Sequence, residues 1–140
     1  MEGKKDALRE LVDASIVARR RAYAPYSKFL VGASLRTKDG TVILGCNVEN
    51  ASYGICNCAE RTAIFSAVAL GHREFEEMVV CTQSGTDTSC GVCRQALFEF
   101  APNMPVHFCN EKGEVKISTT VKGMLPNAFG PQSLGLPSKL

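Results

Sequence analysis

Two short stretches decide how this chain folds: Asn57-Cys58-Ala59-Glu60-Arg61 and, further along, Ser89-Cys90-Gly91-Val92-Cys93-Arg94. The first places a thiol two residues before a carboxylate, and the second is a C-x-x-C pair. Three thiolates would make a zinc site with one coordination position left open, which is typical of catalytic zinc and not of structural zinc. The two stretches therefore predict a metal site, and the rest of the chain has to bring them together.

Length and composition predict one ordinary domain over residues 1–140, with a flexible tail from about residue 133. The chain is 45% hydrophobic and 21% charged, as in a typical soluble globular domain. No apolar run approaches the roughly 18 residues that span a bilayer, so no membrane partner is expected and a cytoplasmic location is predicted. A net charge of +2 is too small to favour nucleic acid, so a small-molecule partner is expected.

The hydrophobic pattern predicts an α/β fold. Lys4–Arg21 has the periodicity of an amphipathic helix, and Lys38-Asp39-Gly40 joins two β-rich runs, Leu30–Thr37 and Thr41–Val48, as a hairpin. Two more helices and three more strands are predicted at Cys58–Leu70, Glu77–Thr82, Cys90–Phe100, Val106–Cys109 and Glu114–Thr119. This order predicts a three-layer α/β/α arrangement with a mixed five-stranded sheet and both cysteine-bearing helices on one face.

The spacing of the cysteines also predicts their chemistry. Cys90 and Cys93 share a face at the start of one helix, and Cys58 begins the other. Free N–H groups and the positive end of the helix dipole favour thiolate over thiol at both places. Glu60 would then lie within reach of a metal-bound water, and Arg61 could offset the negative charge by donating a hydrogen bond to a ligand sulfur.

A structural four-cysteine site is the rival interpretation, because Cys56 could close the tetrahedron. From spacing alone the two arrangements are about equally good. The short C-x-C spacing and the lack of any role for Glu60 in a closed site favour the open one. The remaining cysteines, Cys46, Cys81 and Cys109, fall in predicted strands, where free cysteine is a small buried hydrophobe. His72 and His107 lack ligand spacing and are predicted to have no site role.

Four motifs between about Ala22 and Phe129 resemble the small, homotetrameric type of zinc-dependent cytidine deaminase. They are Tyr23-Ala24-Pro25-Tyr26-Ser27-Lys28-Phe29, Gly45-Cys46-Asn47-Val48-Glu49-Asn50-Ala51-Ser52-Tyr53, Cys58-Ala59-Glu60-Arg61-Thr62-Ala63 and Cys90-Gly91-Val92-Cys93-Arg94-Gln95. The resemblance implies one Zn²⁺ per subunit on Cys58, Cys90 and Cys93. It also implies hydrolytic deamination of cytidine and 2′-deoxycytidine in pyrimidine salvage, with zinc-bound hydroxide attacking C4 and Glu60 shuttling protons.

The resemblance implies the substrate contacts as well. Asn47 and Glu49 would hold the ribose 3′-hydroxyl, although by themselves they look like turn or helix-cap residues. Phe29 would pack on the base, which the backbone of Ala59 and the carbonyl of Thr88 would read. The active sites of a homotetramer would be shared, with the loop Ala51-Ser52-Tyr53 and Phe129 reaching across to neighbouring subunits.

One position departs from the family pattern, which usually has proline immediately before the C-x-x-C. Here the residue is Ser89, so we expect this loop to be softer than proline would make it. Two alternatives stay open at this point: a deaminase of another aminopyrimidine nucleoside, and a non-catalytic four-cysteine zinc-stabilised binding module.

Overall fold

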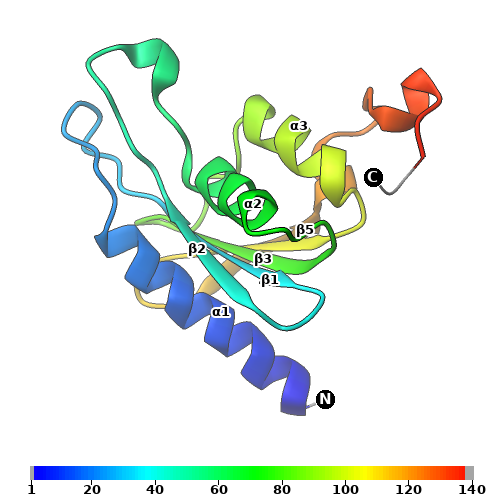
Figure 1. Ribbon diagram of the computed structural model, residues 1–140. Coiled ribbons are helices and arrows are strands. Elements are labelled where there is room, and N and C mark those ends of the chain that lie inside the picture. The colour runs from blue at the N-terminus through cyan, green and yellow to red at the C-terminus, as the bar shows by residue number, and fades with distance from the viewer. Residues whose placement is uncertain (1, 138–140) are drawn as a thin grey trace.

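The computed structural model describes residues 2–137 as helices, strands and short turns in an alternating order (Figure 1). Helix α1 (Glu2–Arg20) precedes the hairpin of β1 (Gly32–Thr37) and β2 (Val42–Cys46). The elements that follow are the 3₁₀ turn η1 (Tyr53–Ile55), α2 (Ala59–Ala69), β3 (Phe75–Cys81), α3 (Gly91–Phe100), β4 (Pro105–Cys109), β5 (Val115–Thr120), α4 (Val121–Met124) and the 3₁₀ turn η2 (Pro131–Leu134).

The five strands form one sheet in the order β2-β1-β3-β4-β5. Among the strands of residues 2–137, β3 and β4 pair in parallel, and the other three neighbouring pairs are antiparallel. The parallel pair of β3 and β4 needs a crossover connection, which α3 supplies. The antiparallel pairs β1/β2 and β4/β5 are each joined directly by a short turn. The predicted mixed five-stranded sheet is therefore confirmed.

The two faces of the sheet carry different helices. In β3, Met78 and Val80 join the core beneath α2 and α3, whereas Val79 and Cys81 point to the other face and pack with Leu11 of α1. Figure 1 shows α2 and α3 side by side above the sheet and α1 running across the opposite face. The three-layer α/β/α arrangement is confirmed, with both cysteine-bearing helices on one face.

The strand ends differ from the prediction where the backbone takes other partners. The run Thr41–Val48 keeps its ladder only to Cys46, because Val48 forms isolated bridges with Tyr23 and Asn57. Strand β3 begins at Phe75, two residues earlier than predicted. The Phe75 ring packs edge-on against the Phe100 ring, with the ring centroids 6.2 Å apart. The bridges of Val48 matter most, because they lead the chain from the sheet to Cys58.

The end of the described chain is partly regular. Pro131–Leu134 form η2, and Gly135 ends this turn in the left-handed region with φ of 71°. The flexible tail predicted from about residue 133 extends into residues 138–140, which lie outside the described residues. Within residues 2–137, the helices are all too short or too polar to cross a lipid bilayer.

Helix α2 lies unusually close to β2, and Gly45 is the reason. A Cβ atom at this position would come within 2.4 Å of the Ala59 carbonyl oxygen and 2.5 Å of the Ala63 nitrogen. Both atoms belong to the backbone of α2, so neither can move without shifting the helix that follows Cys58. Glycine at residue 45 therefore sets how near the first cysteine lies to the sheet.

We predict that Gly45→Ala destabilises the fold by about 3 kcal/mol, the upper end of the usual cost of overpacking, because backbone meets backbone. Thermal or chemical unfolding measures this change. Gly54→Ala is the matched control, since a Cβ at Gly54 meets no atom within 4 Å and should leave stability nearly unchanged. Equal stability of Gly45→Ala and the wild type would contradict the close packing of α2 on β2.

Candidate zinc site

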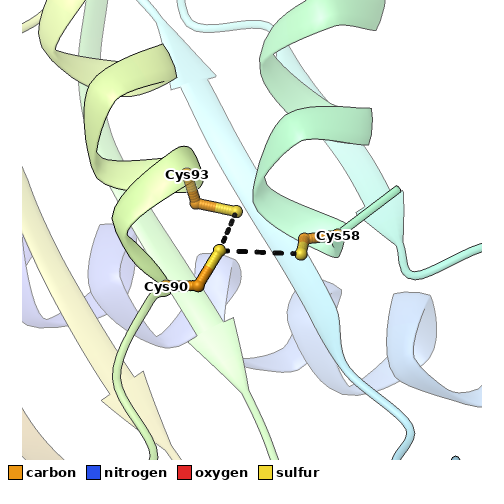
Figure 2. Close-up of side chains that lie close together, drawn as sticks. All are labelled: Cys58, Cys90 and Cys93. Atoms are coloured by element: carbon orange, nitrogen blue, oxygen red, sulfur yellow. Dashed lines mark hydrogen bonds between the residues drawn. The ribbon is translucent and has the colours of Figure 1, made fainter. Parts of the chain in front are cut away.

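The three cysteines of the two opening motifs lie where α2 and α3 begin. Cys58 and Cys90 are the residues that precede these helices, both in extended conformation, and neither side chain caps its own helix. Cys93 follows in the first turn of α3 and is buried. Figure 2 shows the three side chains pointing toward one another from the two helices.

The distances between the sulfur atoms fit a zinc ion. Cys58 Sγ lies 3.9 Å from Cys90 Sγ, which in turn lies 3.6 Å from Cys93 Sγ. All three sulfurs lie within 4.8 Å of one another. Tetrahedral Zn²⁺ with Zn–S bonds of about 2.3 Å requires sulfurs roughly 3.8 Å apart. The three thiols can therefore bind one Zn²⁺ with little movement, and they leave a fourth position open.

The surroundings of Cys58 favour its thiolate form. A hydrogen bond from Cys93, together with the hydrogen bond and positive charge of Arg61, lowers the pKa of Cys58 to about 5, against the opposing effect of burial. The Arg61 Nη2 atom lies 3.2 Å from Cys58 Sγ. Because zinc with three thiolates carries a net negative charge, this guanidinium lies where it can offset part of that charge.

Glu60 lies in the first turn of α2 and is almost completely buried, with 5% of its surface exposed. Burial raises the pKa of its carboxyl group above the usual value. Among residues 2–137, the metal-ligating group consists of the three cysteines, and Glu60 is not a member. A buried carboxyl beside a metal site but outside its ligand set is suited to accept and return a proton.

Cys56 lies apart from this group. Its sulfur accepts a hydrogen bond from the Asn50 amide at 3.2 Å and donates one to the Asn50 carbonyl at 3.5 Å. These contacts close the loop of residues 50–56 on itself. The closed four-cysteine arrangement is therefore not formed, and the open site is the one that the structure supports.

A short backbone pairing between Val48 and Asn57 holds the segment with the predicted sugar-binding residues next to the segment that leads into Cys58. Val48 and Asn57 exchange two backbone hydrogen bonds of 2.9 Å, which place the residues around Val48 beside Cys58. Asn47 accepts a hydrogen bond from the Val31 amide at 2.9 Å and donates one to the Phe29 carbonyl at 2.7 Å. Asn47 thus fixes the backbone that carries Phe29.

Glu49 is held in a similar way by the loop before β1. Its Oε1 atom accepts hydrogen bonds from the amides of Tyr26 and Ser27, each 3.0 Å long, and its Oε2 atom accepts one from the Ser27 hydroxyl. The Ser27 hydroxyl and these amides hold the pKa of Glu49 below its usual value. The carboxylate therefore stays ionised and keeps lone pairs that can accept from a sugar hydroxyl.

The other predicted substrate contacts divide into buried and exposed positions. Ala59 is fully buried at the start of α2, whereas Ala51 and Thr88 are exposed. Tyr53 is 72% exposed, with its ring 5.7 Å from that of Tyr26, and Phe129 is 62% exposed. Both rings are therefore largely open to solvent in one chain.

Arg94 is a residue whose position the sequence alone did not reveal. It donates hydrogen bonds to the Ser89 carbonyl at 2.8 Å, the Met124 carbonyl at 2.7 Å and the Thr88 hydroxyl at 3.0 Å. Arg94 therefore holds the segment before Cys90, where the family usually has proline. Its place directly after the C-x-x-C was the only signal available in the sequence.

Two further contacts could not be read from spacing. Gln95 donates a hydrogen bond of 2.9 Å to the Phe129 carbonyl, so α3 holds the segment that carries this exposed ring. His107, which we expected to have no site role, lies on the α1 side of the sheet. It makes 2.7 Å hydrogen bonds with Glu77 and Ser118 on the neighbouring strands.

A cavity of about 610 Å³ lies away from the cysteines, at the other ends of the two helices. It is lined by Val68 near the end of α2, Phe100 at the end of α3, and Phe75 and Pro105 where β3 and β4 begin. None of the three cysteines lines this cavity, so it is separate from the candidate zinc site. The zinc site itself lies at the surface, where Cys90 is exposed and Cys58 is half-buried.

Comparison with known proteins gives one consistent result. Residues 5–109 match the family model described as the cytidine and deoxycytidylate deaminase zinc-binding region. The chain belongs to this family.

Individual members of the zinc-binding deaminase family are similar over most of the chain. A cytidine deaminase of Sporosarcina psychrophila is 48% identical over 127 residues, covering 89% of this chain and 93% of the relative. The crystal structure of a cytidine deaminase from Burkholderia pseudomallei has a TM-score of 0.82 at 51% identity, covering 86% of this chain and 97% of that one. A blasticidin-S deaminase of Bacillus cereus is 30% identical over 109 residues, covering 71% and 76%.

We predict that Cys58→Ala loses bound zinc, whereas Cys56→Ala retains one zinc ion per chain. The first substitution removes a sulfur 3.9 Å from Cys90 Sγ, and the second removes a sulfur whose contacts are with Asn50. Metal analysis of the purified proteins after dialysis measures both results. Loss of zinc in Cys56→Ala would overturn the open three-cysteine site.

Proposed function

We propose that this protein is a zinc-dependent hydrolase that converts cytidine and 2′-deoxycytidine to uridine and 2′-deoxyuridine, with water consumed and ammonia released. One observation carries the proposal: three sulfurs spaced for a single Zn²⁺ lie beside a buried carboxyl that is not a ligand. Membership of the cytidine and deoxycytidylate deaminase family supports the same reaction.

The residues of the chain divide the work between holding the metal and moving protons. Cys58, Cys90 and Cys93 would hold Zn²⁺, which when bound supplies the Lewis acidity that makes a water nucleophilic at neutral pH. Glu60 accepts the proton of that water and returns protons to N3 of the pyrimidine and to the departing amino group. Burial of Glu60 excludes bulk water as a competing proton acceptor.

The remaining predicted residues bind and orient the nucleoside. Asn47 and Glu49 take the ribose 3′-hydroxyl, since one amide and one carboxylate can donate and accept together. Phe29 packs against the base, which is oriented by the Ala59 backbone and the Thr88 carbonyl. Support comes from the Asn47 hydrogen bond to Phe29 and from the pairing of Val48 with Asn57, which keep these groups beside Cys58.

We also propose that the protein works as a homotetramer with shared active sites. Tyr53 and Phe129 are among the large apolar side chains that are exposed in one chain. Such side chains are expected to be covered in the working assembly. Ala51 and Tyr53 would come from one neighbour's loop and Phe129 from another. All seven cysteines are free, which suits a reducing cytoplasm and a role in pyrimidine salvage.

A second substrate class deserves a direct comparison. The relative from Bacillus cereus bears the name blasticidin-S deaminase, so a related aminopyrimidine nucleoside is the alternative substrate for this chain. Parallel assays of ammonia release from cytidine, 2′-deoxycytidine and blasticidin S separate the two. We expect turnover of the first two, and exclusive turnover of blasticidin S would favour the alternative.

We predict that Glu60→Gln lowers kcat for cytidine by about 10²–10⁴-fold, the usual contribution of a general acid and base, while zinc content stays at one per chain. Glutamine keeps the size of glutamate but cannot carry the proton. Ammonia release and metal analysis on the same preparation measure both quantities. A wild-type protein that binds zinc but releases no ammonia from any nucleoside would favour a non-catalytic zinc module.

We predict that Phe129→Ala raises KM for cytidine by about tenfold, in the range expected for loss of one aromatic contact, without changing zinc content. The ring is 62% exposed in one chain, so its removal should not affect the folding of the monomer. Steady-state kinetics and size-exclusion chromatography measure affinity and assembly. An unaltered KM in an intact oligomer would count against shared sites.

A further inference from the structure

The ring of Phe129 is exposed, but the backbone that carries it is tied to α3. Phe129 lies in the segment of residues 125–130, a turn and irregular backbone that follow α4. Gln95 Nε2 donates a hydrogen bond of 2.9 Å to the Phe129 carbonyl oxygen. In Figure 1 this segment, coloured orange, runs beside α3. One side chain of the helix therefore holds a residue whose ring is 62% exposed.

The residue after Phe129 is also packed against α3. Gly130 is buried, and a Cβ atom there would lie 2.6 Å from Cε1 and 3.1 Å from Cδ1 of the Phe98 ring. Phe98 packs in turn against the core cluster beneath α3, so its ring has little room to move away. The Gly130 amide donates a hydrogen bond of 3.2 Å to the Ser133 hydroxyl. The backbone is thus held at residue 129 and again at residue 130.

The same helix carries two of the zinc-site cysteines, so these contacts relate the ring to the metal site. Cys93 belongs to the cysteine cluster, and the next two residues of α3 bind the two ends of the later segment. Arg94 donates to the Met124 carbonyl at 2.7 Å, and Gln95 donates to the Phe129 carbonyl at 2.9 Å. Because an α-helix is stiff over one turn, the segment has a defined place relative to the sulfur atoms.

We propose that Gln95 is a positioning residue for nucleoside binding: its side-chain amide holds the Phe129 backbone and so presents the ring in the orientation that meets the nucleoside in a neighbouring subunit. This inference rests on the proposed role of Phe129 in a shared site. A loop that becomes ordered only on binding loses conformational entropy at that step, whereas a loop already held in the binding conformation does not. The benefit of Gln95 therefore appears in KM and not in the chemical step.

The kinetic test compares the wild type with Gln95→Glu and Gln95→Ala, each zinc-loaded. The carboxylate of Gln95→Glu has the size of the amide but cannot donate a hydrogen bond. We expect both variants to raise KM for cytidine about threefold to tenfold, the effect of losing one ordinary hydrogen bond, with kcat changed less than about twofold. The control is Glu99→Ala, one helical turn further along α3 and also exposed, which should match the wild type.

Wild-type KM in either Gln95 variant would overturn the proposal. Zinc content should stay at one per chain, and size-exclusion chromatography should show the wild-type assembly. A rise in KM that comes with loss of zinc or of the assembly would also overturn the proposal, because Gln95 would then maintain the fold and not the ring.

A double-mutant cycle with Phe129→Ala shows whether Gln95 acts through the ring. If it does, adding Gln95→Ala to Phe129→Ala raises KM no further. If the two increases in KM multiply, Gln95 acts elsewhere and the inference fails. If Phe129→Ala alone leaves KM unchanged, the shared site of the proposed function fails instead.

A fluorescence measurement tests the hold on the ring without any substrate. The chain contains no tryptophan, so Phe129→Trp introduces a single tryptophan whose angular freedom is measured by time-resolved anisotropy. We expect Gln95→Glu in this background to make the amplitude of nanosecond depolarisation about twofold larger, and Glu99→Ala to leave it unchanged. Equal anisotropy decays with and without Gln95→Glu would show that Gln95 does not position residue 129, whatever the substrate is.

Discussion

The site depends on the fact that two helices begin at the same edge of one sheet. Strands β2 and β3 are both antiparallel to β1, so they run in the same direction and end at the same edge. Each is followed by a helix, and the residue before each helix is a cysteine with a free side chain. The close approach of α2 to the sheet at Gly45 then brings Cys58 to within 3.9 Å of Cys90. Without this topology the same residues would be three unrelated thiols.

Three thiolates in this arrangement would concentrate negative charge, and the pKa values of the neighbouring side chains are shifted from their usual values. A hydrogen bond from Cys93, followed by the hydrogen bond and positive charge of Arg61, lowers the pKa of Cys58 and favours its thiolate. Glu60 is buried beside the same cluster, so its own ionisation is made harder by burial. The lowered pKa of Cys58 favours binding of a cation by the sulfurs. The raised pKa of Glu60 favours exchange of a proton by its carboxyl group. The thiols lie at the surface, where Cys90 is exposed and Cys58 is half-buried, whereas Glu60 is buried behind them with 5% of its surface exposed.

The sequence predicted the layers, the mixed sheet and the cysteine cluster because each rests on a local pattern. Helix periodicity, the Lys38-Asp39-Gly40 turn and the C-x-x-C spacing are all visible over a few residues. Contacts across long separations were not predictable in the same way. Arg94 reaches Met124 across 30 residues, and His107 reaches Glu77 across the same separation; neither leaves a signal in spacing or periodicity. The side chains of Asn47 and Glu49 looked like turn residues, and they do hold a loop, so their contacts in one chain are compatible with both interpretations.

The loop before Cys90 shows how two different residues can meet one requirement. The Thr88 carbonyl, which we propose orients the substrate, must be held still, and a proline at residue 89 would achieve this by fixing its own φ. In this chain Arg94 reaches the same segment from the first turns of α3, with one bond to the backbone of Ser89 and one to the side chain of Thr88. The guanidinium is planar and presents several donors in fixed directions, so a single side chain can restrain two residues and anchor them to Met124 as well. Because the restraint comes from Arg94, the backbone before Cys90 is held without a proline at residue 89.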